Sequence, residues 1–204
     1  MVRYLTIFNL IFYTLIGLHS CKPIMYKIYG IEPIKSFDQN KYNETIKFFN
    51  SNNFENNVFS YLGEAKSFDE YSSLDTVRKN TLKQPIQILY FEGNVLKSFH
   101  ANCFAKGSMT GNLNWNYDNK FNSFIPKSAI NLEKTDINLS DIKRIYNITD
   151  KTQGITIVFF WTNFLRKNSL EAFKVITNNL KSYSMNNDIT ILTINTDYSF
   201  IYSD

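Results

Sequence analysis

"ITIVFFWTNFLRKNSLEAFKVITNNLKSYSMNNDITILTINTD", residues 155–197, is the segment from which the fold class can be inferred. Its two ends, Ile155–Trp161 and Ile189–Asn195, are continuous apolar runs, which are typical of strands buried on both faces of a sheet. Between them an apolar stripe recurs at helical spacing and predicts a helix from Asn168 or Ser169, the expected cap, to about Tyr183. The stripe consists of Leu170, Phe173, Ile176 and Leu180. A buried strand, a helix and a second buried strand form a right-handed parallel unit, so the predicted fold class is α/β.

Upstream of this unit, hydrophobic periodicity predicts three further helices and one strand. Asp38 is the expected cap of a helix that reaches about Asn50. A short apolar strand follows at 58–62, and a weaker helix is expected over 68–82. The last of the three helices begins at Ser140 or Asp141 and ends near Ile145.

A hairpin is predicted in "KQPIQILYFEGNVLKSF", residues 83–99. Pro85 leads into the apolar strand 86–91, the Glu92-Gly93-Asn94 turn follows, and residues 95–99 form the partner strand. No period persists between about residues 100 and 131. A loop of that length is usually functional or loosely ordered.

Three segments resemble parts of the thioredoxin-like family. "IVFFWTNFLRKNS" resembles the strand that runs into the family's Trp-Cys-x-x-Cys turn, and "DITILTINTD" is similar to the next strand, with Asn195 and Asp197 at its Asn-x-Asp ending. "QPIQILYFEGNVL" is similar to the family's cis-proline hairpin, with Pro85 at the proline and Gly93 at the hairpin glycine. The resemblance covers about half of the chain after its first twenty residues. It implies a mixed sheet flanked by helices.

The chain departs from the family in chemistry and in order. Counted from Phe160-Trp161, the two family cysteines would fall at Leu165 and Asn168, neither of which can form a thiolate, so dithiol exchange at this turn is excluded. The hairpin precedes the strand–helix–strand unit, whereas it follows that unit in thioredoxins. The chain therefore holds either one rearranged sheet or two degenerate copies, and we expect the single rearranged sheet.

The resemblance also implies a binding groove where family substrates pair with the backbone. Its candidate residues here are Pro85, Trp161, Phe164, Arg166 and Lys167. The alternative is that the aromatic and aliphatic side chains of this turn only pack it.

The first twenty residues have the layout of a secretory signal. Arg3 is followed by an uncharged, mainly apolar run from Tyr4 to Leu18. The Leu18-His19-Ser20-Cys21 sequence then resembles the lipobox of bacterial lipoproteins, with His19 as its irregular position. That resemblance implies cleavage before Cys21, acylation of Cys21, and an exported protein anchored through lipid to a bacterial membrane. An ordinary cleaved signal and an uncleaved anchor remain as alternatives.

These patterns predict a signal peptide, a tether and one domain. The signal covers 1–20, the lipid-anchored tether covers 21–33, and the thioredoxin-like domain covers 34–204. The domain consists of a hairpin half at about 54–103, a loop at about 104–138 and a βαβ half at about 139–204.

A thiol nucleophile is the second hypothesis for function. Cys103 follows His100 by three residues, and an imidazole can draw off a thiol proton. A buried, inert Cys103 is the alternative. If Cys21 is not lipidated, a disulfide between Cys21 and Cys103 becomes possible in an oxidising compartment.

The long loop suggests a third hypothesis, in which the protein is a structural subunit of an envelope complex. Its aromatic residues alternate with Asn and could recognise a sugar or a peptide, or could pack under the loop itself. They are Trp115, Tyr117, Phe121 and Phe124.

The charge pattern and the motif content argue against several classes of partner and cofactor. The formal net charge of +4 comes from 22 basic and 18 acidic residues without clustering, which argues against nucleic acid as a partner. Neither metal-ligand spacing nor a phosphate-binding loop occurs, and we expect no metal and no cofactor. The favoured reading is a membrane-tethered, non-enzymatic module in the cell envelope that binds a protein or peptide.

Overall fold

The computed structural model describes residues 26, 30–52, 57–108, 111–133, 135–152, 154–183 and 189–201. The α-helices are α2 (Gln39–Asn52), α3 (Ala65–Ser72), α4 (Lys79–Leu82), α5 (Leu139–Ile145) and α6 (Arg166–Ser182). The strands are β1 (Asn57–Leu62), β2 (Gln87–Glu92), β3 (Val95–Ala101), β4 (Lys106–Gly107), β5 (Leu113–Asn114), β6 (Ile155–Trp161) and β7 (Ile189–Asn195). Short 3-10 turns are η1 (Asn102–Phe104), η2 (Tyr117–Asn119), η3 (Asn163–Leu165) and η4 (Asp197–Phe200).

Five strands form one mixed sheet in the order β1-β7-β6-β2-β3. β1, β7 and β6 are parallel, whereas β2 runs antiparallel to both β6 and β3. The predicted α/β class and the expectation of a mixed sheet flanked by helices are confirmed. The N-terminal half of the chain contributes strands on both sides of the β6–β7 pair, so the predicted hairpin and the strand–helix–strand unit share a single sheet.

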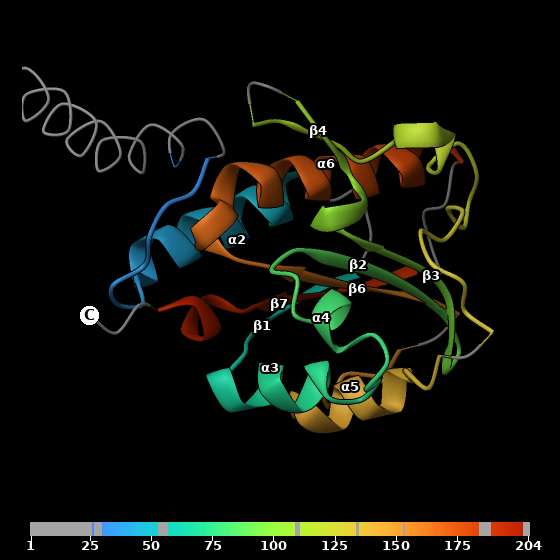
Figure 1. Cartoon of the computed structure of the whole chain (residues 1–204), viewed down its shortest axis with the longest axis horizontal. Coiled ribbons are helices and arrows are strands. Elements are labelled where there is room, and N and C mark those ends of the chain that lie inside the picture. The colour runs from blue at the N-terminus through green and yellow to red at the C-terminus, as the bar shows by residue number, and fades with distance from the viewer. Residues whose placement is uncertain are drawn as a thin grey trace, which may run out of the picture.

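The sheet is the middle layer of three (Figure 1). α2 and α6 cover one face, while α3, α4 and α5 cover the other. Alternation along β6 supplies both cores: Ile157, Phe159 and Trp161 face α2 and α6, whereas Val158 and Phe160 face the short helices. All five side chains are fully buried. This two-sided burial is the reason that β6 reads as an uninterrupted apolar run.

Most predicted elements lie where the periodicity placed them. Asp38 caps α2 as expected, because its Oδ1 accepts hydrogen bonds from the backbone N–H groups of Asn40 and Lys41 at 3.0 and 3.1 Å. Gly93 adopts a φ of 56° in the turn between β2 and β3, a conformation that glycine reaches without steric cost.

The prediction of one helix over 68–82 is wrong, because the chain forms α3 and α4 with a break between them. The Ser72 and Ser73 hydroxyls donate to the carbonyl of Asp69 and compete with continuation of the helix. Asp75 is buried and forms a 2.6 Å ion pair with Arg78, which fixes the connecting turn.

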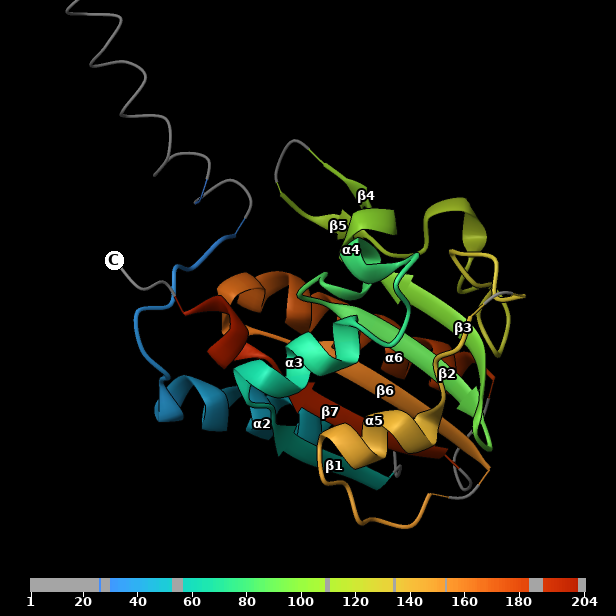
Figure 2. The same cartoon turned by 60° about the horizontal axis from the view of Figure 1, so that its bottom comes forward.

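The long connection after β3 is more ordered than the sequence indicated. β3 continues to Ala101, and the two-residue strands β4 and β5 form a small hairpin inside the predicted loop. Figure 2 shows this hairpin projecting from the end of the molecule above β3.

Candidate functional site

The carboxyl ends of β1, β7 and β6 meet at one edge of the sheet because these strands are parallel. The chain leaves β6 toward α6 on one face and leaves β1 toward α3 on the other face. β7 lies between these diverging connections. In open α/β sheets, ligands bind in the crevice outside the carboxyl ends of strands where the connections diverge in this way.

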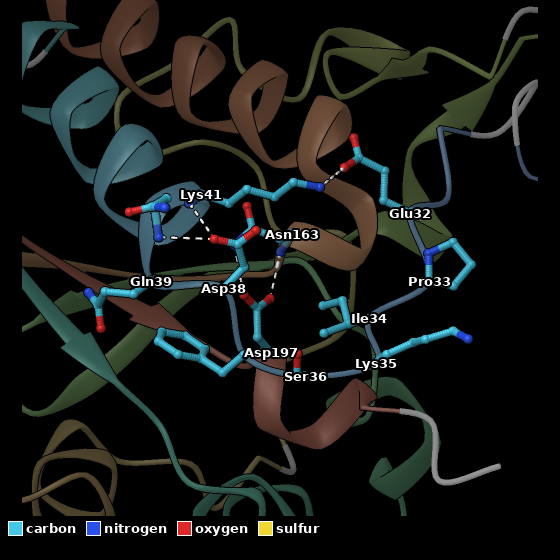
Figure 3. Close-up of a pocket in the computed structure, with 12 residues that line it drawn as sticks. Glu32, Pro33, Ile34, Lys35, Ser36, Asp38, Gln39, Lys41, Asn163 and Asp197 are labelled. Carbon is cyan, nitrogen blue, oxygen red and sulfur yellow. Dashed lines mark hydrogen bonds and ion pairs between the residues drawn. The ribbon is translucent and has the colours of Figure 1, made fainter.

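A depression of about 380 Å³ lies at this edge (Figure 3). Asn163 follows β6 and Asp197 follows β7, and both are buried. The other wall is the segment 32–41, which precedes α2 and forms its first turn. The backbone of this segment is attached to the edge, since Glu32 N–H donates to the Phe164 carbonyl at 2.9 Å.

Asp197 joins the ends of β6 and β7. Its carboxylate accepts hydrogen bonds from Thr162 Oγ1 at 2.7 Å, from the Asn163 backbone N–H at 2.6 Å and from Asn163 Nδ2 at 2.7 Å. Its own N–H donates to Asn195 Oδ1 at 3.0 Å. The three donors satisfy this buried side chain, so Asp197 is a structural anchor of this edge.

The open side of the depression carries mixed charge. Lys41 Nζ lies 2.9 Å from Glu32 Oε2, and both side chains are partly exposed. Asp38 is already engaged as the cap of α2. This lining offers hydrogen bonds to a polar ligand. The described residues contain no cluster of three or more His, Cys, Asp or Glu side chains that could hold a metal ion.

The turn where the family's thiols would lie carries an apolar and an amide side chain at the two thiol positions. Leu165 and Asn168 are both buried, at 9% and 3% exposure. The prediction that Asn168 or Ser169 caps α6 is wrong: the chain enters α6 through η3, and Thr162 Oγ1 accepts from the Phe164 N–H at the start of that turn. Ser169 instead lies inside the helix, where its hydroxyl donates to the Thr162 carbonyl at 3.0 Å.

The structure separates the five candidate groove residues. Trp161 is fully buried and stacks on Tyr42, with ring centroids 5.6 Å apart. Phe164 stacks on Phe200 at 5.6 Å. These two aromatic side chains therefore pack the turn, as the alternative reading predicted.

Pro85 departs from the family pattern. Phe124–Ile125 is the one cis peptide bond among the described residues, so the bond before Pro85 is trans and the expected cis-proline is wrong. The Gln84 carbonyl accepts a 2.7 Å hydrogen bond from Gln87 Nε2, which fixes the direction of that peptide group.

Arg166 and Lys167 do lie together, in a second depression of about 300 Å³ beside the start of α6. Arg166 is held by an ion pair with Glu44 at 2.9 Å, whereas Lys167 is exposed. Leu170 and Lys174, about one and two turns further along α6, extend this depression. The remaining lining residues are Glu32 and Glu171.

Cys103 and His100 do not form the environment that an activated thiol needs. Cys103 is exposed on η1, and partial burial of its sulfur raises the pKa of the thiol. His100 is buried on β3, where its Nε2 lies 3.0 Å from Ser98 Oγ and its ring lies 4.6 Å from that of Phe121. Burial, with the nearby Lys120 charge, lowers the pKa of His100 to about 3. The interactions of the imidazole are thus with Ser98 and Phe121.

The aromatic residues of the long loop divide into a buried and an exposed set. Trp115 and Phe121 are buried in the core under α6, and Phe124 packs against it. Tyr117 is exposed. The expectation that the loop tucks its aromatics beneath itself is confirmed for the buried residues.

Sequence reasoning missed Thr162 and Asn163 and assigned no role to the Asp197 side chain. A signal was present, since a polar Thr-Asn pair follows one buried strand and an Asp follows the next, and both strands were predicted to be parallel. Carboxyl ends of parallel strands meet at one edge, so these side chains could have been expected to lie together.

The predicted signal segment and Cys21 lie outside the described residues. Within the described part of the chain, no helix is long and apolar enough to span a bilayer.

Comparisons with models of known protein families, with curated proteins and with solved structures found no match to this chain.

Proposed function

We propose that this protein is a lipid-anchored module of the bacterial cell envelope whose redox-inactive, thioredoxin-like domain binds an extended peptide or protein segment. The observation that carries the proposal is the turn after β6. In the resemblance, this turn corresponds to the redox turn of thioredoxins. It buries Leu165 and Asn168 at the two thiol positions. Beside it, at the start of α6, lies a depression lined by Arg166 and Lys167.

The sheet supports the thioredoxin-like part of the proposal. An antiparallel hairpin pairs with the strand that leads into the turn, and that strand is parallel to the strand after the helix. These are the spatial relations that the resemblance implies, although the chain presents the hairpin first. The trans bond before Pro85 counts against a substrate site of the family type, and it moves the proposed contact surface to the start of α6.

Electrostatics indicate which peptides fit. Lys167 and Lys174 are basic residues along the depression, and Glu171 is an acidic one. Glu32 forms an ion pair with Lys41 and Arg166 forms one with Glu44, so the remaining charge of the lining is positive. Lys167 is the exposed cation nearest the start of α6, where the helix dipole also favours negative charge. An extended segment with acidic side chains is therefore the ligand class we assign.

Binding is tested by fluorescence titration of the full chain with acidic and basic extended peptides of equal length. We expect the acidic peptides to bind more tightly and Lys167→Glu to weaken them about tenfold or more, because an attractive contact becomes a repulsive one. Lys151→Glu is the matched control, since Lys151 is exposed in the connection between α5 and β6. Equal affinity of the two variants for the acidic peptides would show that the peptides do not bind at the start of α6.

The anchor is tested separately, by metabolic labelling with a palmitate analogue in a bacterial host. The proposal requires label on the wild-type chain and none on Cys21→Ser. An unlabelled wild-type chain would refute the lipid anchor and leave the peptide-binding proposal to its own titration.

A further inference from the structure

The connection between β3 and α5 presents two lysines around one exposed tyrosine. Lys106 Nζ lies 5.0 Å and Lys120 Nζ lies 5.5 Å from the centroid of the Tyr117 ring. Tyr117 is 38% exposed. We call these three residues the Lys–Tyr–Lys cluster.

The cluster is held on a rigid base. Asn179 on α6 donates hydrogen bonds to the carbonyls of Phe121 and Ser123 at 2.8 and 3.1 Å, so the segment after Tyr117 is attached to the helix below it. Asn116 Oδ1 accepts from the Phe121 N–H at 2.8 Å. The neighbouring Trp115 is buried in the core. The exposed ring is thus positioned by buried contacts on both sides of it in the sequence.

The positive charge of the cluster is not neutralised locally. No carboxylate of the described residues lies within ion-pair distance of Lys106 or Lys120, and this includes Asp118, the acidic residue adjacent to the ring. A further exposed lysine, Lys127, donates its backbone N–H to the Lys120 carbonyl at 2.8 Å. Lysines gathered on one surface without a paired carboxylate give it a positive potential, which attracts an anion.

The geometry also decides which kind of anion fits. Both ammonium groups lie over the Tyr117 ring, so they compete with a sugar for its face. The β4–β5 hairpin projects from the body of the molecule, and the segment after it lies along the outer edge (Figures 1 and 2). A projecting surface suits a flat partner better than it suits a small molecule. Tyrosine with flanking lysines is the combination that a lipid–water interface accommodates, because the ring enters the headgroup layer and the charges meet lipid phosphates.

We propose that the Lys–Tyr–Lys cluster docks the folded domain onto an anionic lipid surface. This contact is made by the domain itself and does not depend on acylation of Cys21 or on peptide binding along α6. It would orient the domain with the projecting connection toward the bilayer.

The test is an amine-acetylation footprint of the full chain, read by mass spectrometry, on vesicles of phosphatidylcholine with or without phosphatidylglycerol. Lys106 and Lys120 should be acetylated at least about threefold more slowly on the anionic vesicles, and high salt should restore their rate. Lys83 and Lys151, which are exposed elsewhere, serve as internal controls and should not change. Equal rates for all four lysines, or no vesicle-bound chain, would overturn the proposal.

Two further arms separate this surface from a small-anion site. Inorganic phosphate without vesicles should give no protection, and protection by phosphate alone would overturn docking. The Lys106→Glu/Lys120→Glu double variant should lose about tenfold or more in affinity for the anionic vesicles relative to a Lys83→Glu/Lys151→Glu control, since each lysine near an anionic surface contributes about fivefold. Equal affinity of the two double variants would also overturn it. Thermal unfolding of both variants checks that the fold is retained.

Discussion

The turn after β6 and the long connection after β3 are held in place by opposite means. At the turn, a buried carboxylate gathers hydrogen bonds from Thr162 and Asn163 and joins two parallel strands. In the connection, Trp115 and Phe121 enter the core, and the buried His100 ring packs against Phe121. A buried polar network loses most of its stabilising free energy when one member is deleted. A region held by packed aromatic rings is instead destabilised by a charge that forms among the buried rings. The two regions should therefore fail under different perturbations.

Deletion of the Asp197 carboxylate should have the largest effect. Asp197→Ala leaves buried donors on Thr162 and Asn163 without an acceptor, and we expect the free energy of unfolding to fall by about 3 kcal/mol or more. Asp197→Asn should cost less, because one oxygen still accepts. Urea denaturation measures both free energies, with Asp136→Ala as control, because Asp136 is exposed and lies outside this edge. A loss below about 0.5 kcal/mol for Asp197→Ala would show that the edge is held by packing.

Acid should weaken the connection through His100. Burial holds the pKa of His100 at about 3 in the folded state, below its ordinary value of 6.5. The unfolded chain therefore binds the proton more readily, and the stability contributed by the neutral ring is present above pH 6.5 and is lost as the pH falls toward 3. The loss should reach about 2 kcal/mol at pH 5.

The measurement for His100 is the free energy of unfolding at a series of pH values from 7 to 4.5. His100→Gln should remove this part of the slope, while Ser98 and Phe121 retain their places around the side chain. An identical slope in wild type and variant would mean that His100 reaches water in the folded state.

The smallest effect is expected at Cys103, which lies on the surface of the connection. Its raised pKa predicts that alkylation at pH 7 is slower than for a free thiol, with a midpoint above the ordinary thiol value. Cys103→Ser should change the free energy of unfolding by less than about 0.5 kcal/mol. A midpoint well below that value would instead support the one-cysteine enzyme hypothesis.

Periodicity in the sequence predicted the elements of the sheet well. β6 and β7 begin and end at the predicted residues, and the hairpin around Gly93 is present. These elements are encoded locally. A strand buried on both faces needs only a continuous apolar run, and the hairpin turn needs only a residue that tolerates positive φ. The break between α3 and α4 was not predicted, because Ser and Asp side chains compete with helix hydrogen bonds in ways that periodicity does not register.

The candidate site was less predictable than the fold. Arg166 and Lys167 are neighbours in sequence, and they share one depression. Pro85, Trp161 and Phe164 were grouped with them through the resemblance alone, and the structure gives them packing or backbone roles. Burial of a particular aromatic ring depends on partners such as Tyr42 and Phe200, which are distant in the chain.

The α/β class, the buried strands and the absence of thiols from the turn after β6 could be inferred from residue type and local spacing. In contrast, the sharing of Asp197 between two strand ends and the approach of Lys106 and Lys120 to Tyr117 are visible in the folded chain and in no local pattern. Both depend on which side chains are brought together from separate segments. Those contacts are determined by the packing of the whole chain, and a local sequence pattern carries no information about them.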